Sequence, residues 1–161
     1  MAVHRVADYD SRDAWDVGLA DLLTGAKVDL VVSAGFLKIL GPAVLSAFPG
    51  RIINTHNSLL PSFPGINGPR DALEAGVRIT GATLFVVDPG MDTGPIIAQV
   101  AVPVLDDDDE ESLLERIKVA ERDQLVTHVG QMARGGWEIN GRRARPLGAG
   151  AAVPVAPPFR S

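Results

Sequence analysis

The chain has 161 residues, of which 46% are hydrophobic, and its formal net charge is −5. This size suits one domain with a sizeable core, and an acidic chain without a Lys/Arg stripe argues against nucleic acid as a partner, because a phosphate backbone requires a basic face. With no apolar run long enough to cross a membrane, no signal peptide, no cysteine and only three histidines, we expect a soluble, cytoplasmic protein with no membrane partner and no metal.

The first half of the chain predicts helices and short strands in alternation. In chain order these are a helix over 11–23, a strand over 29–35, a helix over 42–48, a strand over 51–55, a loop over 60–69 and a helix over 70–75. Ser11 is the expected N-cap of the first helix, and the valine-rich run 29–35 is typical of a strand buried on both faces. His56 follows the second strand, where open α/β sheets place their ligands.

The second half predicts a pair of strands, a long helix and a final hairpin or edge strand. The ranges are 78–88 and 95–105 for the strands, 106–111 for a solvated acidic loop, about 110–133 for the helix and 137–145 for the hairpin. The candidate core residues of the long helix are Leu113, Leu114, Ile117, Val119, Leu125, Val126 and Val129. We expect one domain over 1–148 and a disordered tail over 149–161, which is rich in Gly, Ala and Pro.

Three side chains next to predicted strands suit acyl transfer to an amine. Asn54 lies near the end of one strand and His56 follows it, whereas Asp92 lies on the turn between two others. An amide and an imidazole can donate hydrogen bonds to a tetrahedral oxyanion, and a carboxylate can assist the departure of a proton from the amine. Taken singly, each residue is better explained as a strand cap or a turn residue.

Six short sequence blocks favour a functional explanation for these residues. They are 34–40 (AGFLKIL), 54–56 (NTH), 58–61 (SLLP), 63–65 (FPG), 81–83 (GAT) and 91–95 (MDTGP). In order and spacing, over roughly the first 145 residues, they resemble the phosphoribosylglycinamide formyltransferases of purine biosynthesis. The resemblance implies an α/β, Rossmann-like catalytic domain with a mostly parallel twisted sheet flanked by helices. It also implies formyl transfer from 10-formyltetrahydrofolate, a cosubstrate, to the amine of glycinamide ribonucleotide without a metal.

The resemblance also assigns roles to residues. Asn54 and a protonated His56 would donate to the oxyanion, while Asp92 would keep His56 charged and order a water that carries the proton away. The implied folate-binding residues are Phe36, Leu37, Lys38, Ile39, Leu40, Asn54, Val86, Val87, Asp88, Pro89, Gly90 and Met91. Lys118 would lie near the ribose phosphate and Glu121 would meet the amino end of the substrate. An exposed ion pair is the ordinary explanation for these two.

The chain departs from the family in three places. Asn57 stands where the family usually has proline, which loosens the backbone beside His56, and Asn67 stands where many members have histidine. The phosphate-binding Gly-x-Gly-Ser-Asn loop does not precede the first helix, so we expect the N-terminal strands to be missing and the chain to enter the fold near the third strand, around 3–6. Loss of the central first strand would expose the edge of 29–32 and favour a homodimer.

Three hypotheses follow from these observations. The first is a glycinamide ribonucleotide formyltransferase that is weakened by the lack of a phosphate loop. The second keeps the chemistry and changes the acceptor, giving a formyltetrahydrofolate hydrolase or a formyltransferase for a sugar nucleotide or initiator tRNA. Lys118, Glu121 and the lack of an added tRNA-binding domain count against it. The third is a folate-binding or dimerisation relic without catalysis.

Overall fold

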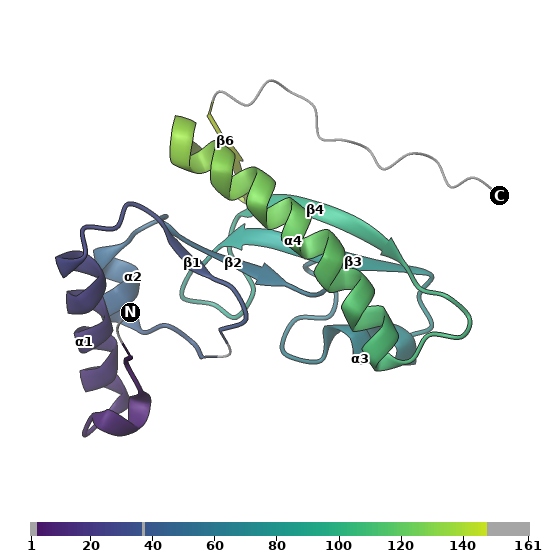
Figure 1. Ribbon diagram of the computed structural model, residues 1–161, viewed down its shortest axis with the longest axis horizontal. Helices are drawn as coiled ribbons and strands as arrows, with labels where there is room; N and C mark the ends of the chain where they lie inside the picture. Colours follow the sequence, from purple (N-terminus) through teal and green to yellow (C-terminus); the bar gives the residue numbers. More distant parts are fainter. Residues whose placement is uncertain (1–2, 37, 148–161) are drawn as a thin grey trace.

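The computed structural model describes residues 3–36 and 38–147. Its elements are η1 Val6–Asp8, α1 Arg12–Gly25, β1 Val31–Ser33, α2 Pro42–Ala47, β2 Ile52–His56, α3 Gly68–Glu74, β3 Ile79–Val86, β4 Ile96–Pro103, α4 Glu110–Gly135, β5 Trp137–Asn140 and β6 Arg143–Pro146 (Figure 1). The predicted tail over 149–161 and Leu37 lie outside the described residues. Within those residues, no helix combines the length and the apolar character that crossing a membrane requires.

Six strands form one mixed sheet in the order β1-β2-β3-β4-β6-β5. The pairs β1–β2 and β4–β6 are parallel, whereas β2–β3, β3–β4 and β5–β6 are antiparallel. The predicted α/β class is confirmed, but the expectation of a mostly parallel sheet does not hold for the described strands. For two of the three antiparallel pairs the reason is the length of the connection. Nine residues join β3 to β4 and two join β5 to β6, which is too short for the crossover that a parallel pair needs.

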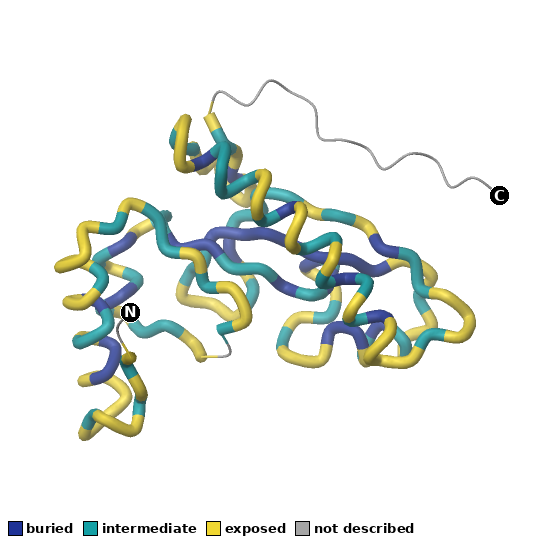
Figure 2. The backbone as a smooth tube through the Cα atoms, viewed as in Figure 1, coloured by how far each residue is buried: buried dark blue, intermediate teal, exposed yellow. Residues whose placement is uncertain are grey.

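α4 lies across one face of this sheet, whereas α1 and α2 pack at the end that holds β1 and β2 (Figure 1). Ile53 packs under α4 in one core cluster, whereas its neighbour Ile52 packs with Val44 and Phe48 beside α1 and α2 in another. Successive side chains of a strand point to opposite faces, so β2 is buried on both sides. Figure 2 shows the same burial continuing along β3, where every residue after Ile79 is buried. The end of β2, which carries the candidate site, therefore rests on the best-packed part of the sheet.

Local sequence signals predicted several element boundaries correctly. The Ser11 side chain accepts a hydrogen bond from Ala14 N at 3.0 Å and caps α1 as expected. The predicted hairpin is confirmed, with Gly141 at φ +59° in its turn. The third helix begins at Gly68 rather than at Arg70, because Pro69 fits the first helical turn and does not belong to the loop.

The prediction of core residues on α4 is partly confirmed. Leu113 and Ile117 are fully buried, whereas Val119 and Val126 are 58% and 74% exposed and were wrongly predicted. The other three predicted core residues, Leu114, Leu125 and Val129, are partly buried. Val119 and Val126 are seven residues apart and share the outer face of the helix, while Met132 joins the core instead.

Two predictions near the N-terminus are wrong. Val32 is 40% exposed, because β1 pairs only with β2 among the described strands, so this run is not buried on both faces. Residues 3–6 do not form a strand. Instead, Trp15 Nε1 donates to the carbonyl oxygen of His4 at 3.2 Å, and the Tyr9 hydroxyl contacts His4 Nδ1 at 3.0 Å, which holds this segment against α1.

The acidic run before α4 contains a structured carboxylate and is not simply a solvated loop. Arg116 donates to both oxygens of Asp108 at 2.7 Å, and Leu105 N donates to the same carboxylate at 2.7 Å. Only 2% of the Asp108 side chain is exposed. The pKa of Asp108 lies well below its ordinary value, mainly because of the hydrogen bonds from Arg116.

We predict that Asp108→Asn lowers the free energy of unfolding near neutral pH and that its difference from the parent shrinks in acid. The folded-state pKa lies below the unfolded value of about 4, so the stabilisation is complete above that value and is lost as the pH falls towards the folded-state pKa. Urea unfolding between about pH 2 and pH 8 measures the difference. Asp107→Asn, at an exposed neighbour, is the control. A difference that stays constant in acid would contradict the prediction.

Candidate active site

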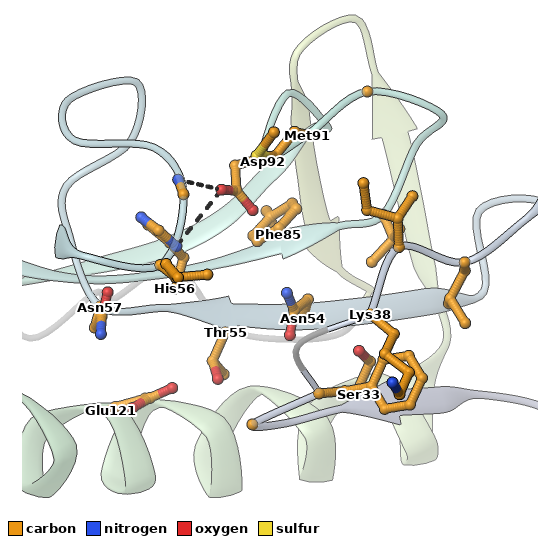
Figure 3. A pocket seen from close by; sticks show the side chains of 18 of the residues that line it. Ser33, Lys38, Asn54, Thr55, His56, Asn57, Phe85, Met91, Asp92 and Glu121 are labelled. Atoms are coloured by element: carbon orange, nitrogen blue, oxygen red, sulfur yellow. Dashed lines mark hydrogen bonds and ion pairs between the residues drawn. The ribbon is translucent and has the colours of Figure 1, made fainter. Parts of the chain in front are cut away.

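A cavity of about 310 Å³ opens at the carboxyl ends of β1 and β2. Its walls are the segment after β1, the loops that follow β2 and β3, and one face of α4 (Figure 3). Asn54, His56 and Asp92 all line it, although they lie up to 38 positions apart in the sequence. The structure thus brings together the three side chains that were singled out by their place next to strands.

His56 is fixed on both sides of its ring. Nδ1 lies 3.7 Å from Asp92 Oδ2, and the two side chains are only 7% and 13% exposed. Nε2 lies 2.8 Å from the carbonyl oxygen of Phe63. Because a carbonyl oxygen can only accept, Nε2 carries a hydrogen and donates it. His56 therefore directs Nδ1 towards Asp92.

Asp92 is held by its loop and by the loop after β2. Its φ of +55° lies in the left-handed region, and Gly65 N donates to its Oδ2 at 2.8 Å. Figure 3 shows one carboxylate oxygen of Asp92 facing both this backbone nitrogen and the His56 ring. Within the Asp92 loop, the Asp88 side chain accepts from Thr93 Oγ1 at 2.7 Å and from Gly90 N at 3.0 Å. The carboxylate is thus positioned before any ligand binds.

Asn54 offers an unused hydrogen-bonding group inside the cavity. Its Oδ1 is buried and has no hydrogen-bond partner among the described residues. Phe85 lies directly opposite on β3 and provides no polar group. A buried polar atom without a partner costs about 1–3 kcal/mol, which a bound ligand can recover. Because a carboxamide can turn to present its oxygen or its NH2 group, Asn54 can serve either a donor or an acceptor.

Lys118 and Glu121, which were expected to contact the substrate, line the cavity from α4. They do not pair with each other. Lys118 Nζ lies 2.5 Å from Glu115 Oε1, and this hydrogen bond lowers the pKa of Glu115. Glu121 has no ion-pair partner within the described part of the chain, and Figure 3 shows it directed from α4 towards the end of β2.

Most of the predicted folate wall lines the cavity. The residues in place are Phe36, Lys38, Ile39, Leu40, Asn54, Val87, Gly90 and Met91. Val86, Asp88 and Pro89 do not line it, and Val86 is buried in the core under α4. Lining residues that were not predicted are Ser33, Gly35, Thr55, Asn57, Gly65, Ile66, Phe85 and Leu114. The pairing of β2 with β3 places Phe85 opposite Asn54. This pairing is the feature that identifies Phe85 as a residue close to the site.

α1 supports the cavity wall from behind. The buried Asp16 side chain accepts from Gly41 N at 2.7 Å and from Ala43 N at 2.8 Å, so it caps α2 from a distant part of the chain. A side chain at Gly41 would collide with this carboxylate. Trp15 stacks on Phe36, with ring centroids 6.2 Å apart and planes 12° apart. No local sequence pattern predicts this cap, because Asp16 and Gly41 are 25 residues apart.

The two residues that differ from the family pattern, Asn57 and Asn67, lie in different places. Asn57 lines the cavity next to His56, and its side-chain oxygen would lie 2.6 Å from a Cβ at Gly68, so the close approach requires glycine there. Asn67 is exposed and does not line the cavity. Within residues 3–36 and 38–147, no three His, Cys, Asp or Glu side chains are grouped closely enough to hold a metal ion.

Known proteins with related sequences and structures share this arrangement of elements. A family model described as formyl transferase matches residues 1–129. The phosphoribosylglycinamide formyltransferase of Mycobacterium tuberculosis is 58% identical over 140 residues, which are 87% of this chain and 65% of that protein. The corresponding protein of Bacillus subtilis is 42% identical over 124 residues, or 77% of this chain and 64% of that one.

A solved structure shows the same fold. Glycinamide ribonucleotide transformylase 1 from Symbiobacterium toebii superposes with a TM-score of 0.84 and 46% identity, covering 88% of this chain and 66% of that chain. The chain therefore spans about two thirds of the length of the relatives it matches.

We predict that Asp16→Ala lowers the free energy of unfolding by about 2–3 kcal/mol, because it leaves backbone N–H groups at the start of α2 without a partner. Urea denaturation measures the change. Asp21→Ala, at an exposed position of the same helix, is the matched control and should change stability by less than about 0.5 kcal/mol. Equal effects of the two substitutions would show that the cap contributes nothing specific.

Proposed function

The chain belongs to the formyl transferase family, and on this premise we propose that it transfers a formyl group from 10-formyltetrahydrofolate to the amine of glycinamide ribonucleotide. The observation that carries the proposal is the convergence of Asn54, His56 and Asp92 in one cavity, with Glu121 on the opposite wall. The relatives named above give the reaction class. The cavity provides groups of the kind that this reaction needs.

The reaction requires donors for a negative charge and a route for a proton. The amine nitrogen attacks the formyl carbon, the carbonyl oxygen becomes an oxyanion, and the bond from the carbon to the folate nitrogen then breaks. The amine loses a proton, and the leaving nitrogen gains one. In the proposed mechanism, the amide of Asn54 and the Nδ1–H of a protonated His56 donate to the oxyanion, because Nε2 is already bound to the Phe63 carbonyl.

Asp92 Oδ2 faces the Nδ1 side of the His56 ring in this scheme. The 3.7 Å between His56 Nδ1 and Asp92 Oδ2 is longer than a direct hydrogen bond, so a water or a substrate atom can mediate the contact. In the proposed mechanism, the proton of the amine leaves through such a water. No metal ion takes part in this scheme.

The two substrates would occupy different walls. The apolar side chains of Phe36, Leu40 and Met91 suit the flat ring of the folate, and backbone groups of their loops can hydrogen-bond its edge. Glu121 carries the negative charge that suits the amino end of glycinamide ribonucleotide. In the proposal, Lys118 on the same helix binds the ribose phosphate, which would compete with Glu115 for the ammonium group of Lys118.

In a formyl-transfer assay with the whole chain, Asn54→Ala, His56→Ala and Asp92→Ala should each lower kcat by about 10²–10³-fold, because each removes a group that stabilises the transition state. His128→Ala is the matched control, since His128 lies on α4, bonds to Gln124 O and does not line the cavity. Turnover near the parental rate in all three cavity variants would overturn the proposal.

The assay also separates the competing functions. Release of formate without a formylated amine would identify a hydrolase instead. If calorimetry shows that a folate analogue binds but neither product forms, the chain is a folate-binding protein without this activity.

A further inference from the structure

Ser58 is a fully buried polar residue that the proposed chemistry does not use. Its Oγ lies 2.5 Å from the carbonyl oxygen of Ser62 and 3.1 Å from that of Phe63. A hydroxyl has one hydrogen, so Ser58 shares it between two successive carbonyl groups. The Phe63 carbonyl is also the group that accepts from His56 Nε2 at 2.8 Å. Ser58 and His56 therefore meet on one oxygen atom.

The backbone at this oxygen needs support from its surroundings. Phe63 has a φ of +53°, in the left-handed region that residues with a Cβ rarely adopt. Such a conformation persists only where surrounding contacts determine it. The hydroxyl of Ser58 provides two of these contacts from inside the loop.

Ser58 is in turn anchored to the centre of the sheet. Thr83 Oγ1, on β3, donates to the carbonyl oxygen of Ser58 at 2.7 Å and accepts from Leu60 N at 3.0 Å. Gln99, on β4, donates to the carbonyl oxygen of Leu60 at 2.8 Å and to Thr83 Oγ1 at 3.1 Å. Both Ser58 and Thr83 have 0% exposure, so solvent does not compete for these bonds.

We propose that Ser58 is a positioning residue that fixes which nitrogen of neutral His56 carries the hydrogen. By holding the Phe63 carbonyl in place, Ser58 keeps the hydrogen on Nε2 of the neutral ring. In the protonated ring of the proposed mechanism, it keeps Nδ1 directed towards Asp92. The two neutral forms of an imidazole differ little on their own, so the partner of one nitrogen decides between them. The consequence for catalysis rests on the proposed function, but the protonation of the ring does not.

The direct test is the protonation state of each ring nitrogen in the full chain. Long-range proton–nitrogen NMR of ¹⁵N-histidine-labelled protein at alkaline pH distinguishes the two neutral forms, and His4→Gln and His128→Gln assign the three histidines. The parent should show hydrogen on Nε2 of His56 alone. Ser58→Ala should show a mixture of both forms.

Ser62→Ala is the matched control, because it removes an exposed hydroxyl from the same loop and leaves the backbone carbonyl in place. Like the parent, it should show hydrogen on Nε2 of His56 alone. If Ser58→Ala does not fold, Ser58→Cys replaces it, since a thiol has a similar size and is a weaker donor. A folded Ser58 variant whose His56 keeps hydrogen only on Nε2 would overturn the proposal.

Kinetics provide the second measurement. Ser58→Ala should lower kcat for formyl transfer by about five- to tenfold, which corresponds to one lost hydrogen bond, and should change KM by less than about twofold. A rise in KM at unchanged kcat would contradict a positioning role. A parent chain with no formyl transfer would count against the proposed function alone, and the NMR measurement would still decide on Ser58.

Discussion

The Asp92 carboxylate faces the His56 ring at 3.7 Å and accepts a hydrogen bond from Gly65 N at 2.8 Å. These two contacts join the loop after β3 to the loop after β2. The His56 ring could otherwise turn about its side-chain bonds. With its Nε2 bound to the Phe63 carbonyl and Nδ1 facing Asp92, it is restricted to one orientation. The proposed mechanism depends on this restriction, because an oxyanion donor is effective only where it is already in position.

The scaffold supports the site from two directions. β2 is buried on both faces, so Asn54 and His56 extend from a strand with little freedom to shift. On the other wall, Asp16 and Trp15 of α1 hold the segment that begins with Phe36. A loop that was fixed only by its own turns would vary in position. These contacts instead attach the segment to the packed helices α1 and α2. Each wall of the cavity therefore has its own structural support.

Local chemistry was enough to predict much of this structure. The Ser11 cap and the hairpin turn at Gly141 depend on neighbouring residues, and both were found as expected. The convergence of Asn54, His56 and Asp92 was predictable because ligands of open α/β sheets bind where strands end. The cap from Asp16, the hydrogen bonds of Asp108 and Arg116, and the network around Ser58 were not predicted, because their partners come from other elements or depend on how a loop folds. A 3.6-residue pattern also does not show how much of a helix the sheet covers, which explains the error at Val119 and Val126.

Hydrogen exchange at the Gly65 amide tests most directly whether Asp92 joins the two loops before substrates bind. In the unliganded parent, this amide should exchange at least about tenfold more slowly than in Asp92→Ala, because its acceptor is present only in the parent. Amides in the centre of β3 should exchange equally in both proteins and so show that the fold is intact. Equal exchange at Gly65 would contradict the view that the Asp92 carboxylate organises the site.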